Sequence, residues 1–328
     1  WSYYLSRRGA EIACEAREEY RHSHKYDNRP LFILGSVGPS NRVLTFSRAG
    51  LTPSTFEEIR ENFRIQIKGL LDGGVDVVLF ETQQDILELK AGIFGARDAM
   101  RECGKHVPVI AQITVDPFAR MQIFNTDIHS ALVSIEALGI DVFGINCSIG
   151  PDLMQTAVEK MSRYAHVPLS TIPNAGLPQS EAGKTVFRFA PKPFAEILSS
   201  LALEYGLNIV GGCCGTTPEF IRQLRACIDK TEKVYAEPKS GTFITSGLKT
   251  LEIGQGLSLI GERINPTGKP RLKEALRQNN INYIIQEAVA QRDAGADILD
   301  VNVGLPEIDE AQMMVKTITE LQALLDLP

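Results

Sequence analysis

Long apolar runs and clustered basic residues are both missing from this sequence, and their absence narrows the classes of protein. No apolar run reaches the roughly 18 residues that a bilayer-spanning helix needs. Lys and Arg form no cluster of the kind that binds nucleic acid or anionic membranes, and the formal net charge is -6. The first 20 residues have a charged helical pattern unlike a signal peptide. The sequence therefore predicts a cytoplasmic protein that acts on small molecules, with no nucleic-acid or membrane partner.

Cysteine is sparse as well, with six in 328 residues. This spacing is unlike that of a disulfide-rich secreted scaffold, and we expect reduced thiols. No two cysteines have the two-residue gap of many zinc motifs. Cys14, Cys103 and Cys227 lie inside helical patterns and are interpreted as small, buried or half-buried apolar residues. The candidates for chemistry are therefore the three cysteines at positions 147, 213 and 214.

From residue 31 onwards, short β-rich runs alternate with longer amphipathic runs. The expected strands are 31–38, 75–82, 107–115, 140–147, 167–173 and 207–214, and the expected helices lie near 54–72, 84–103, 127–138, 151–164, 190–205 and 217–230. Such alternation is typical of βα units around a parallel sheet. A lone helix at 1–25 precedes them. We expect an α/β fold, a (β/α)8 TIM barrel lacking its first two strands, with an open doubly wound sheet as the alternative.

The βα pattern breaks at residues 231–256, a polar stretch containing Gly, Ser and Lys that is typical of an interdomain linker. A strand and loop, a helix at 279–294, a strand ADILDVNVG and a helix at 307–325 follow. We interpret residues 1–230 as an N-terminally truncated barrel and 257–328 as the C-terminally truncated start of a second (β/α)8 barrel. The chain starts at Trp1 without a methionine, and both ends are expected to be cut.

The three candidate cysteines stand at the ends of predicted strands. Cys147 ends one strand, and the pair Cys213 and Cys214 ends another. The carboxyl ends of parallel barrel strands gather at one mouth, where the sulfurs could converge on one ion. Zinc binds thiolates tetrahedrally, and three protein ligands leave a fourth position for a substrate. The positions of these cysteines are thus consistent with a catalytic zinc site.

An adjacent cysteine pair is also consistent with a packed apolar doublet or a vicinal disulfide. Ordinary strand geometry would point the two side chains to opposite faces. Gly211, Gly212 and Gly215 surround the pair and allow an irregular turn that points both toward one centre. The glycines favour the zinc site over the alternatives.

Four segments, GGCCGTTPEFI (211–221), GINCSIGP (144–151), LFETQQDILELKAG (79–92) and PNAGLP (173–178), carry a family resemblance. They closely resemble the homocysteine S-methyltransferase domain of the cobalamin-dependent methionine synthases, over about residues 1–230. The resemblance implies a zinc-dependent barrel of eight units in which Cys147, Cys213 and Cys214 ligate the metal. It also implies that Glu81 and Thr82 hold the amino-acid portion of homocysteine and that Asn174 lies close to the zinc. By itself, Glu81 would be interpreted as a rim carboxylate bonded to loop amides.

The C-terminal segments IGERINPTG (260–268) and DILDVNVG (297–304) resemble the start of the pterin-binding barrel that follows in the same family. The resemblance implies pterin-binding roles for Glu262, Asn265, Asp300 and Asn302. A hydrogen-bonded strand end is nearly as good an interpretation of Asp300 and Asn302. Because the later strands of that barrel are missing, we expect no competent folate site in this chain.

The predicted function is methyl transfer. A thiol bound to zinc is deprotonated, so its sulfur becomes a nucleophile. By resemblance, homocysteine thiolate accepts a methyl group from methylcobalamin, held by a cobalamin-binding domain absent from this chain and regenerated from 5-methyltetrahydrofolate, to give methionine. No catalytic residue beyond the metal site is predicted. The family's Asp-Gly motif on the first strand is missing, so the chain is expected to be incomplete for activity.

Two alternatives stay open at this stage. One is a homocysteine methyltransferase that uses betaine or S-methylmethionine as the donor, which would share the zinc motif but has no reason to continue into GERINPTG. The other is a non-catalytic zinc or redox-sensing protein in which Cys213 and Cys214 form a reversible disulfide.

Overall fold

The computed structural model describes residues 1–42, 44, 54–229 and 240–328. The chain divides into two compact units, Trp1–Lys239 and Ser240–Pro328, each with its own apolar core. Among the described residues, no helix combines the length and apolar character that crossing a bilayer requires.

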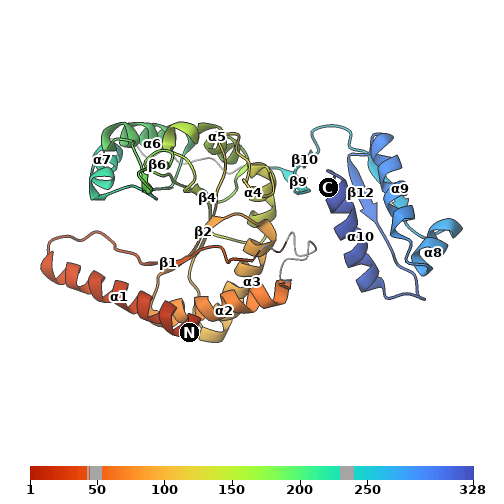
Figure 1. Ribbon diagram of the computed structural model, residues 1–328, viewed down its shortest axis with the longest axis horizontal. Coiled ribbons are helices and arrows are strands. Elements are labelled where there is room, and N and C mark those ends of the chain that lie inside the picture. Colours follow the sequence, from red (N-terminus) through yellow and green to blue (C-terminus); the bar gives the residue numbers. More distant parts are fainter. Residues whose placement is uncertain (43, 45–53, 230–239) are drawn as a thin grey trace. The chain divides into compact units, whose positions relative to one another are not determined.

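A six-stranded parallel sheet forms the centre of the first unit. Its strands, in spatial order, are β1 (Leu34–Val37), β2 (Val77–Gln83), β3 (Val109–Ile113), β4 (Val142–Asn146), β5 (Leu169–Ile172) and β8 (Ile209–Val210). The spatial order follows the chain without reversal, which does not fit the doubly wound alternative, where the order reverses at a switch point. Figure 1 shows the helices arranged in an arc around these strands. The fold is therefore α/β with a curled parallel half-barrel sheet.

The helices of the first unit lie close to their predicted positions. They are α1 (Ser2–Ser23), α2 (Phe56–Gly73), α3 (Ile86–Cys103), α4 (Ile128–Glu136), the 3-10 turn η1 (Pro151–Leu153), α5 (Gln155–Tyr164), α6 (Pro191–Tyr205) and α7 (Pro218–Ile228). Local capping explains several ends: Thr55 and Glu58 form a capping box at the start of α2, and Gly74 ends that helix with a φ of 96°. Glycine at this end lets the chain turn into β2.

The two faces of the sheet have different chemistry. Phe80 and Phe143 alternate with inward-facing residues and are fully buried in the main core, where Phe80 packs against Phe63 of α2. Leu79, Ile110 and Val142 face the opposite way and form a small cluster of their own. Farther along the strands this inner face becomes polar.

A buried amide illustrates the polar inner layer. The register aligns Gln112, Gly144 and Ser170 on adjacent strands, and Gln112 Nε2 donates to Ser170 Oγ at 2.7 Å. Gly144 makes this contact possible, since a Cβ there would lie 2.4 Å from the Ser170 carbonyl oxygen. Polar side chains thus occupy the inner face toward the carboxyl ends of the strands.

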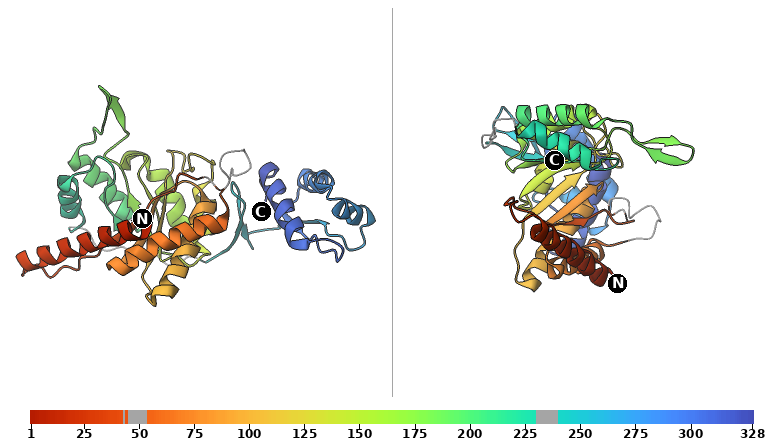
Figure 2. Two further views of the ribbon diagram at one scale, coloured as in Figure 1. Left: turned by 60° about the horizontal axis from the view of Figure 1, so that its bottom comes forward. Right: turned by 90° about the vertical axis from the view of Figure 1, so that its left-hand side faces the viewer.

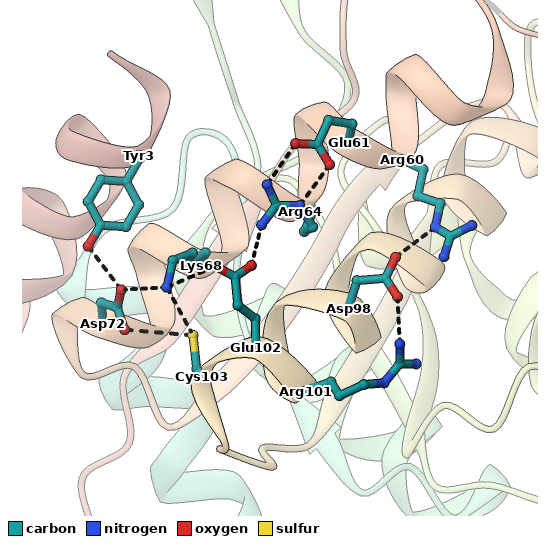
Figure 3. A network of polar contacts seen from close by, with 10 residues as sticks. All are labelled: Tyr3, Arg60, Glu61, Arg64, Lys68, Asp72, Asp98, Arg101, Glu102 and Cys103. Atoms are coloured by element: carbon teal, nitrogen blue, oxygen red, sulfur yellow. Dashed lines mark hydrogen bonds and ion pairs between the residues drawn. The ribbon is translucent and has the colours of Figure 1, made fainter.

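Polar contacts join the first three helices on their outer surfaces (Figure 3). Tyr3 Oη donates to Asp72 Oδ2 at 2.9 Å, which links α1 to α2. Lys68 of α2 lies 3.3 Å from Asp72 and 3.5 Å from Glu102 of α3. Exposed ion pairs contribute little individually, so the buried apolar faces of these helices carry most of the stabilisation.

A hairpin of β6 (Gln179–Glu181) and β7 (Lys184–Val186), which the sequence did not predict, follows β5. It appears in green, projecting from the body of the first unit in both views of Figure 2. Ala182 and Gly183 have positive φ values of 48° and 76°, as a tight hairpin turn requires.

The second unit contains α8 (Pro270–Arg277), α9 (Ile281–Asp293), α10 (Glu310–Leu324) and the parallel strands β11 (Ile260–Ile264) and β12 (Ile298–Val301). Helix α8 was not predicted. Part of the expected linker 231–256, residues 231–239, lies outside the described residues. The rest of it contains two strands that the sequence did not predict, β9 (Thr242–Thr245) and β10 (Thr250–Ile253), which form an antiparallel hairpin. The alternating TFIT and TLEI segments explain this hairpin, because alternation suits a half-buried strand.

Candidate metal centre

The three predicted metal-binding cysteines lie together. Their sulfur atoms are all within 4.8 Å of one another, and Cys147 Sγ lies 3.8 Å from Cys214 Sγ. Cys147 follows β4 directly, and the Cys213–Cys214 pair follows β8, with only β5 between these strands. The parallel sheet therefore brings residues more than 60 positions apart to the same edge.

The backbone at Cys147 leaves the strand conformation abruptly. Cys147 and Ser148 have φ values of 62° and 67°, in the left-handed region. The Cys147 N–H still donates to the Ile172 carbonyl at 3.0 Å, which anchors the turn to β5. The change of conformation breaks the alternation of side chains, so the Cys147 sulfur can point along the strand ends.

The adjacent cysteine pair is held by backbone contacts to the chain after β5. Cys213 N–H donates to the Pro173 carbonyl at 2.8 Å, and Cys214 N–H donates to Asn174 Oδ1 at 3.1 Å. Gly215 has a φ of 78°, and a Cβ on Gly212 would lie 2.6 Å from the Thr216 side chain. The flanking glycines thus permit the irregular turn that the sequence suggested.

The donor set and its spacing fit zinc. Tetrahedral coordination with Zn–S bonds of about 2.3 Å places sulfur atoms about 3.8 Å apart. The distance between the Cys147 and Cys214 sulfurs is 3.8 Å, and the Cys213 sulfur lies within 4.8 Å of both. Cys214 is exposed while the other two are half-buried, so the cluster is open to a further ligand on one side.

The electrostatics of the cluster favour one thiolate in the absence of metal. A hydrogen bond from Cys213 lowers the pKa of the Cys147 thiol to about 5, helped by the Ser148 backbone N–H. The same hydrogen bond, together with burial, raises the pKa of Cys213. Burial and the nearby Cys147 charge raise the pKa of Cys214. Cys147 is therefore the sulfur that starts out ionised.

The predicted substrate-binding residues lie at the end of β2. Ser36 Oγ donates to Glu81 Oε1, and Thr82 has a φ of 60°. Thr82 N–H donates to Asn146 Oδ1 at 2.7 Å, and Asn146 Nδ2 donates back to Thr82 Oγ1 at 2.9 Å. Asn174, predicted near the zinc, contacts the cysteine pair through its side chain, which accepts the Cys214 N–H.

Asn146 was not singled out in the sequence. A signal was available, because positions 142, 144 and 146 share one face of β4 and this face points inward. An asparagine at the inward end of that series, next to Cys147, has to be bonded within the site if it is buried.

The predicted pterin-binding residues lie in the second unit. Asn265 Nδ2 donates to Glu262 Oε1 at 2.6 Å, and Lys269 lies 3.1 Å from Glu262 Oε2 and lowers the pKa of that carboxyl. Asn302 is on the neighbouring strand end: its N–H donates to the Ile264 carbonyl and its Oδ1 accepts the Gly304 N–H. Asp300 is an exposed residue of β12. The structure thus pairs Glu262 with Asn265, while the pterin-binding roles stay predictions.

Comparison with known proteins identifies the family. The homocysteine S-methyltransferase family profile matches residues 2–228, and the chain belongs to that family. The crystal structure of the homocysteine methyltransferase MmuM from Escherichia coli has a similar fold, with a TM-score of 0.52 and 22% identity over 69% of this chain and 73% of that one. Its metallated form gives a TM-score of 0.53 over 68% of this chain and 70% of that one.

Longer relatives extend the similarity into the second unit. Methionine synthase from Mycobacterium tuberculosis is 33% identical over 98% of this chain, and that from Mycobacterium leprae is 34% identical over the same share. The chain spans 27% of the length of each relative. The resemblance to methionine synthases is thereby confirmed, and with it the class of enzyme, a methyltransferase.

Proposed function

We propose that the first unit activates the thiol of homocysteine for methyl transfer, as the first part of a cobalamin-dependent methionine synthase. The observation that carries this proposal is the group of three cysteine sulfurs within 4.8 Å at the carboxyl ends of β4 and β8. Cys147, Cys213 and Cys214 would hold zinc, with the exposed side left for the substrate sulfur. Zinc bound there would lower the pKa of the homocysteine thiol, so that the thiol is ionised at neutral pH.

The residues around the cysteines would bind the rest of the substrate. Glu81, at the end of β2, offers a carboxylate to the homocysteine ammonium group, and a charge-assisted hydrogen bond of this kind is stronger than a neutral one. Thr82 would contribute from the same strand end. Asn174 fixes the backbone of Cys214 and so orients one of the sulfurs. In the transfer itself, the substrate sulfur forms a bond to the methyl carbon as the donor–methyl bond breaks, and the electron pair leaves with the donor.

The identity of the donor rests on the second unit. Identity to methionine synthases covers 98% of the chain and therefore continues past residue 228, where the family match ends. We infer that Glu262, Asn265, Asp300 and Asn302 belong to the start of a 5-methyltetrahydrofolate-binding barrel, and that methylcobalamin on a further domain delivers the methyl group. An enzyme that uses betaine or S-methylmethionine has no need of this second unit.

Metal analysis tests the proposed function. The chain purified under reducing conditions should hold about one zinc, because three thiolates form one tetrahedral site. Cys214→Ala should lose the metal, whereas Cys103→Ala, which removes a half-buried thiol between α2 and α3, should keep it. Zinc-free protein with a reversible Cys213–Cys214 disulfide would contradict the proposal and support redox sensing.

Homocysteine binding provides the second measurement. Adding homocysteine to the zinc-loaded chain should release about one proton as its thiol becomes a ligand. Homoserine, in which a hydroxyl replaces the thiol, is the matched control and should release none. Equal behaviour of the two compounds would exclude thiolate activation by this site.

A further inference from the structure

Asn146 is the last residue of β4 and the immediate neighbour of Cys147. Only 1% of its surface is exposed, so its side-chain amide must find partners within the protein. It shares the inward face of β4 with Gly144, one layer nearer the cysteines than the Gln112–Ser170 contact. Asn146 therefore lies between the inner polar layer and the metal centre.

The Asn146 amide contacts two parts of the site at once. Its Oδ1 accepts the Thr82 N–H at 2.7 Å and its Nδ2 donates to Thr82 Oγ1 at 2.9 Å. The same Nδ2 lies 3.9 Å from Cys213 Sγ. An amide nitrogen carries two hydrogens, so one can serve the threonine while the other faces the sulfur.

The contact with Thr82 has a conformational consequence. Thr82 has a φ of 60°, and a left-handed conformation costs a non-glycine residue roughly 1–2 kcal/mol. Such strain persists where surrounding contacts hold it, and Asn146 supplies two of them. Because Glu81 precedes Thr82 directly, the Asn146 amide also fixes the end of the strand on which that carboxylate lies.

The contact with Cys213 has an electrostatic consequence. An N–H that faces a thiolate stabilises its negative charge, and groups that bond to metal ligands orient them and tune the metal. The same side chain also bonds Thr82 at the end of β2. A shift of Thr82 would therefore displace the Asn146 amide relative to the Cys213 sulfur, and a shift of Cys213 would act on Thr82 in the same way.

We propose that Asn146 is a positioning residue that couples the substrate-binding end of β2 to the metal-binding sulfur of Cys213. This inference rests on the proposed function, since it assigns β2 to homocysteine and the cysteines to zinc. Asn146 touches neither the reacting sulfur nor the methyl group in this assignment, and it acts through Thr82 and Cys213.

The test uses the whole 328-residue chain loaded with Co(II), whose visible spectrum reports thiolate coordination. Asn146→Ala should still bind one Co(II), but its sulfur-to-metal absorption band should shift, and its dissociation constant for homocysteine should rise about tenfold, as expected for loss of one or two buried hydrogen bonds. Asn146→Asp keeps an acceptor for the Thr82 N–H but replaces the N–H that faces Cys213. Its absorption band should shift too.

Gln112→Ala is the matched control. Gln112 is also 1% exposed and also bonded across the inner face, but its amide donates to Ser170 rather than to the site. This variant should keep the wild-type Co(II) spectrum and homocysteine affinity, even if its melting temperature falls. The melting temperatures of all three variants separate loss of fold from loss of positioning.

Two outcomes would overturn the inference. A wild-type spectrum for Asn146→Ala, together with a homocysteine affinity within twofold of wild type, would show that Asn146 acts on neither Thr82 nor Cys213. A wild-type spectrum for Asn146→Asp would limit Asn146 to supporting Thr82. Failure of the proposed function would be seen in the unmutated chain, as no Co(II) binding or no spectral response to homocysteine, and is thereby distinguished from failure of this inference. If Co(II) binds but homocysteine does not, the spectra of the variants still test whether Asn146 acts on Cys213.

Discussion

Thr82 and Cys147 both have left-handed backbone conformations, with φ values of 60° and 62°, although neither is glycine. Each lies where a strand ends, β2 in one case and β4 in the other. Left-handed conformations at functional sites persist because the surrounding structure over-determines them, and here the contacts of Asn146 with Thr82 and of Cys147 with β5 have that effect. At the scale of single residues, left-handed backbone conformations at the strand ends therefore set the positions of the Thr82 and Cys147 side chains.

The protonation states of the cysteines predict a proton count for metal uptake. At pH 7 the metal-free cluster should contain one thiolate, Cys147 with its pKa of about 5, and two thiols, because the pKa values of Cys213 and Cys214 are raised. Binding of one zinc by three thiolates should therefore release about two protons. Below pH 5 Cys147 is protonated as well, so the release should rise toward three and zinc affinity should fall.

Calorimetric titration of zinc in two buffers with different ionisation enthalpies measures this proton release. Cys147→Ser, which removes the low-pKa thiol, is the control and should bind zinc more weakly. Release of three protons at pH 7 from the unchanged chain would show that Cys147 is a thiol there.

At the scale of elements, α1 and α2 approach each other very closely. A Cβ on Gly69 would lie 2.3 Å from the Tyr3 carbonyl oxygen, and one on Gly73 would lie 2.5 Å from Ala10 Cβ. These glycines are four residues apart and lie on one face of α2, so they form a flat surface against α1. Helix α1 thus packs on α2 through a surface that requires glycine at both positions.

A glycine substitution tests this close approach. Gly69→Ala should destabilise the chain by about 1–3 kcal/mol, because added atoms in a tightly packed contact force the backbones apart. Gly9→Ala, in α1, is the matched control: its Cβ would meet nothing within 4 Å, so it should stabilise the helix by about 0.5–1 kcal/mol.

Urea denaturation of both variants gives the two free energies of unfolding. If Gly69→Ala were as stable as Gly9→Ala, α1 would not pack on α2 through this surface.

At the scale of the whole molecule, the two units have separate apolar cores. The first is built around residues such as Phe80, Phe143 and Ile67, and the second around residues such as Ile264, Leu276 and Ile284. The proposed zinc ligands all belong to the first unit. A ligand stabilises only the cooperative unit whose native state binds it.

Calorimetric unfolding with and without zinc should therefore show selective stabilisation. We expect two transitions, of which one moves to higher temperature when zinc is added, while the other keeps its midpoint. A chelator should reverse the shift. In Cys214→Ala neither transition should respond to zinc, and a common shift of both transitions in the unchanged chain would contradict the assignment of the metal to the first unit.

Prediction from sequence succeeded where local periodicity is strong. The strand predicted at 140–147 corresponds to β4, which ends at Asn146, and the strand predicted at 207–214 is reduced to the two residues Ile209–Val210 of β8, so the cysteines follow these strands rather than end them. Short elements were missed: α8, the β6–β7 hairpin and the hairpin inside the expected linker. Few residues in such elements carry a periodic signal, so turn chemistry and tertiary contacts decide them.

The sequence by itself determined the order of the longer strands and helices of the first unit and their approximate positions, because side-chain alternation and helix caps depend on neighbouring positions. It also contained the four segments that mark the homocysteine S-methyltransferase family. Only the tertiary structure decided that three sulfurs lie within 4.8 Å and that the Asn146 amide bonds Thr82 while facing Cys213. These contacts join residues more than 60 positions apart, and their distances depend on the curl and register of the sheet, which no local pattern records.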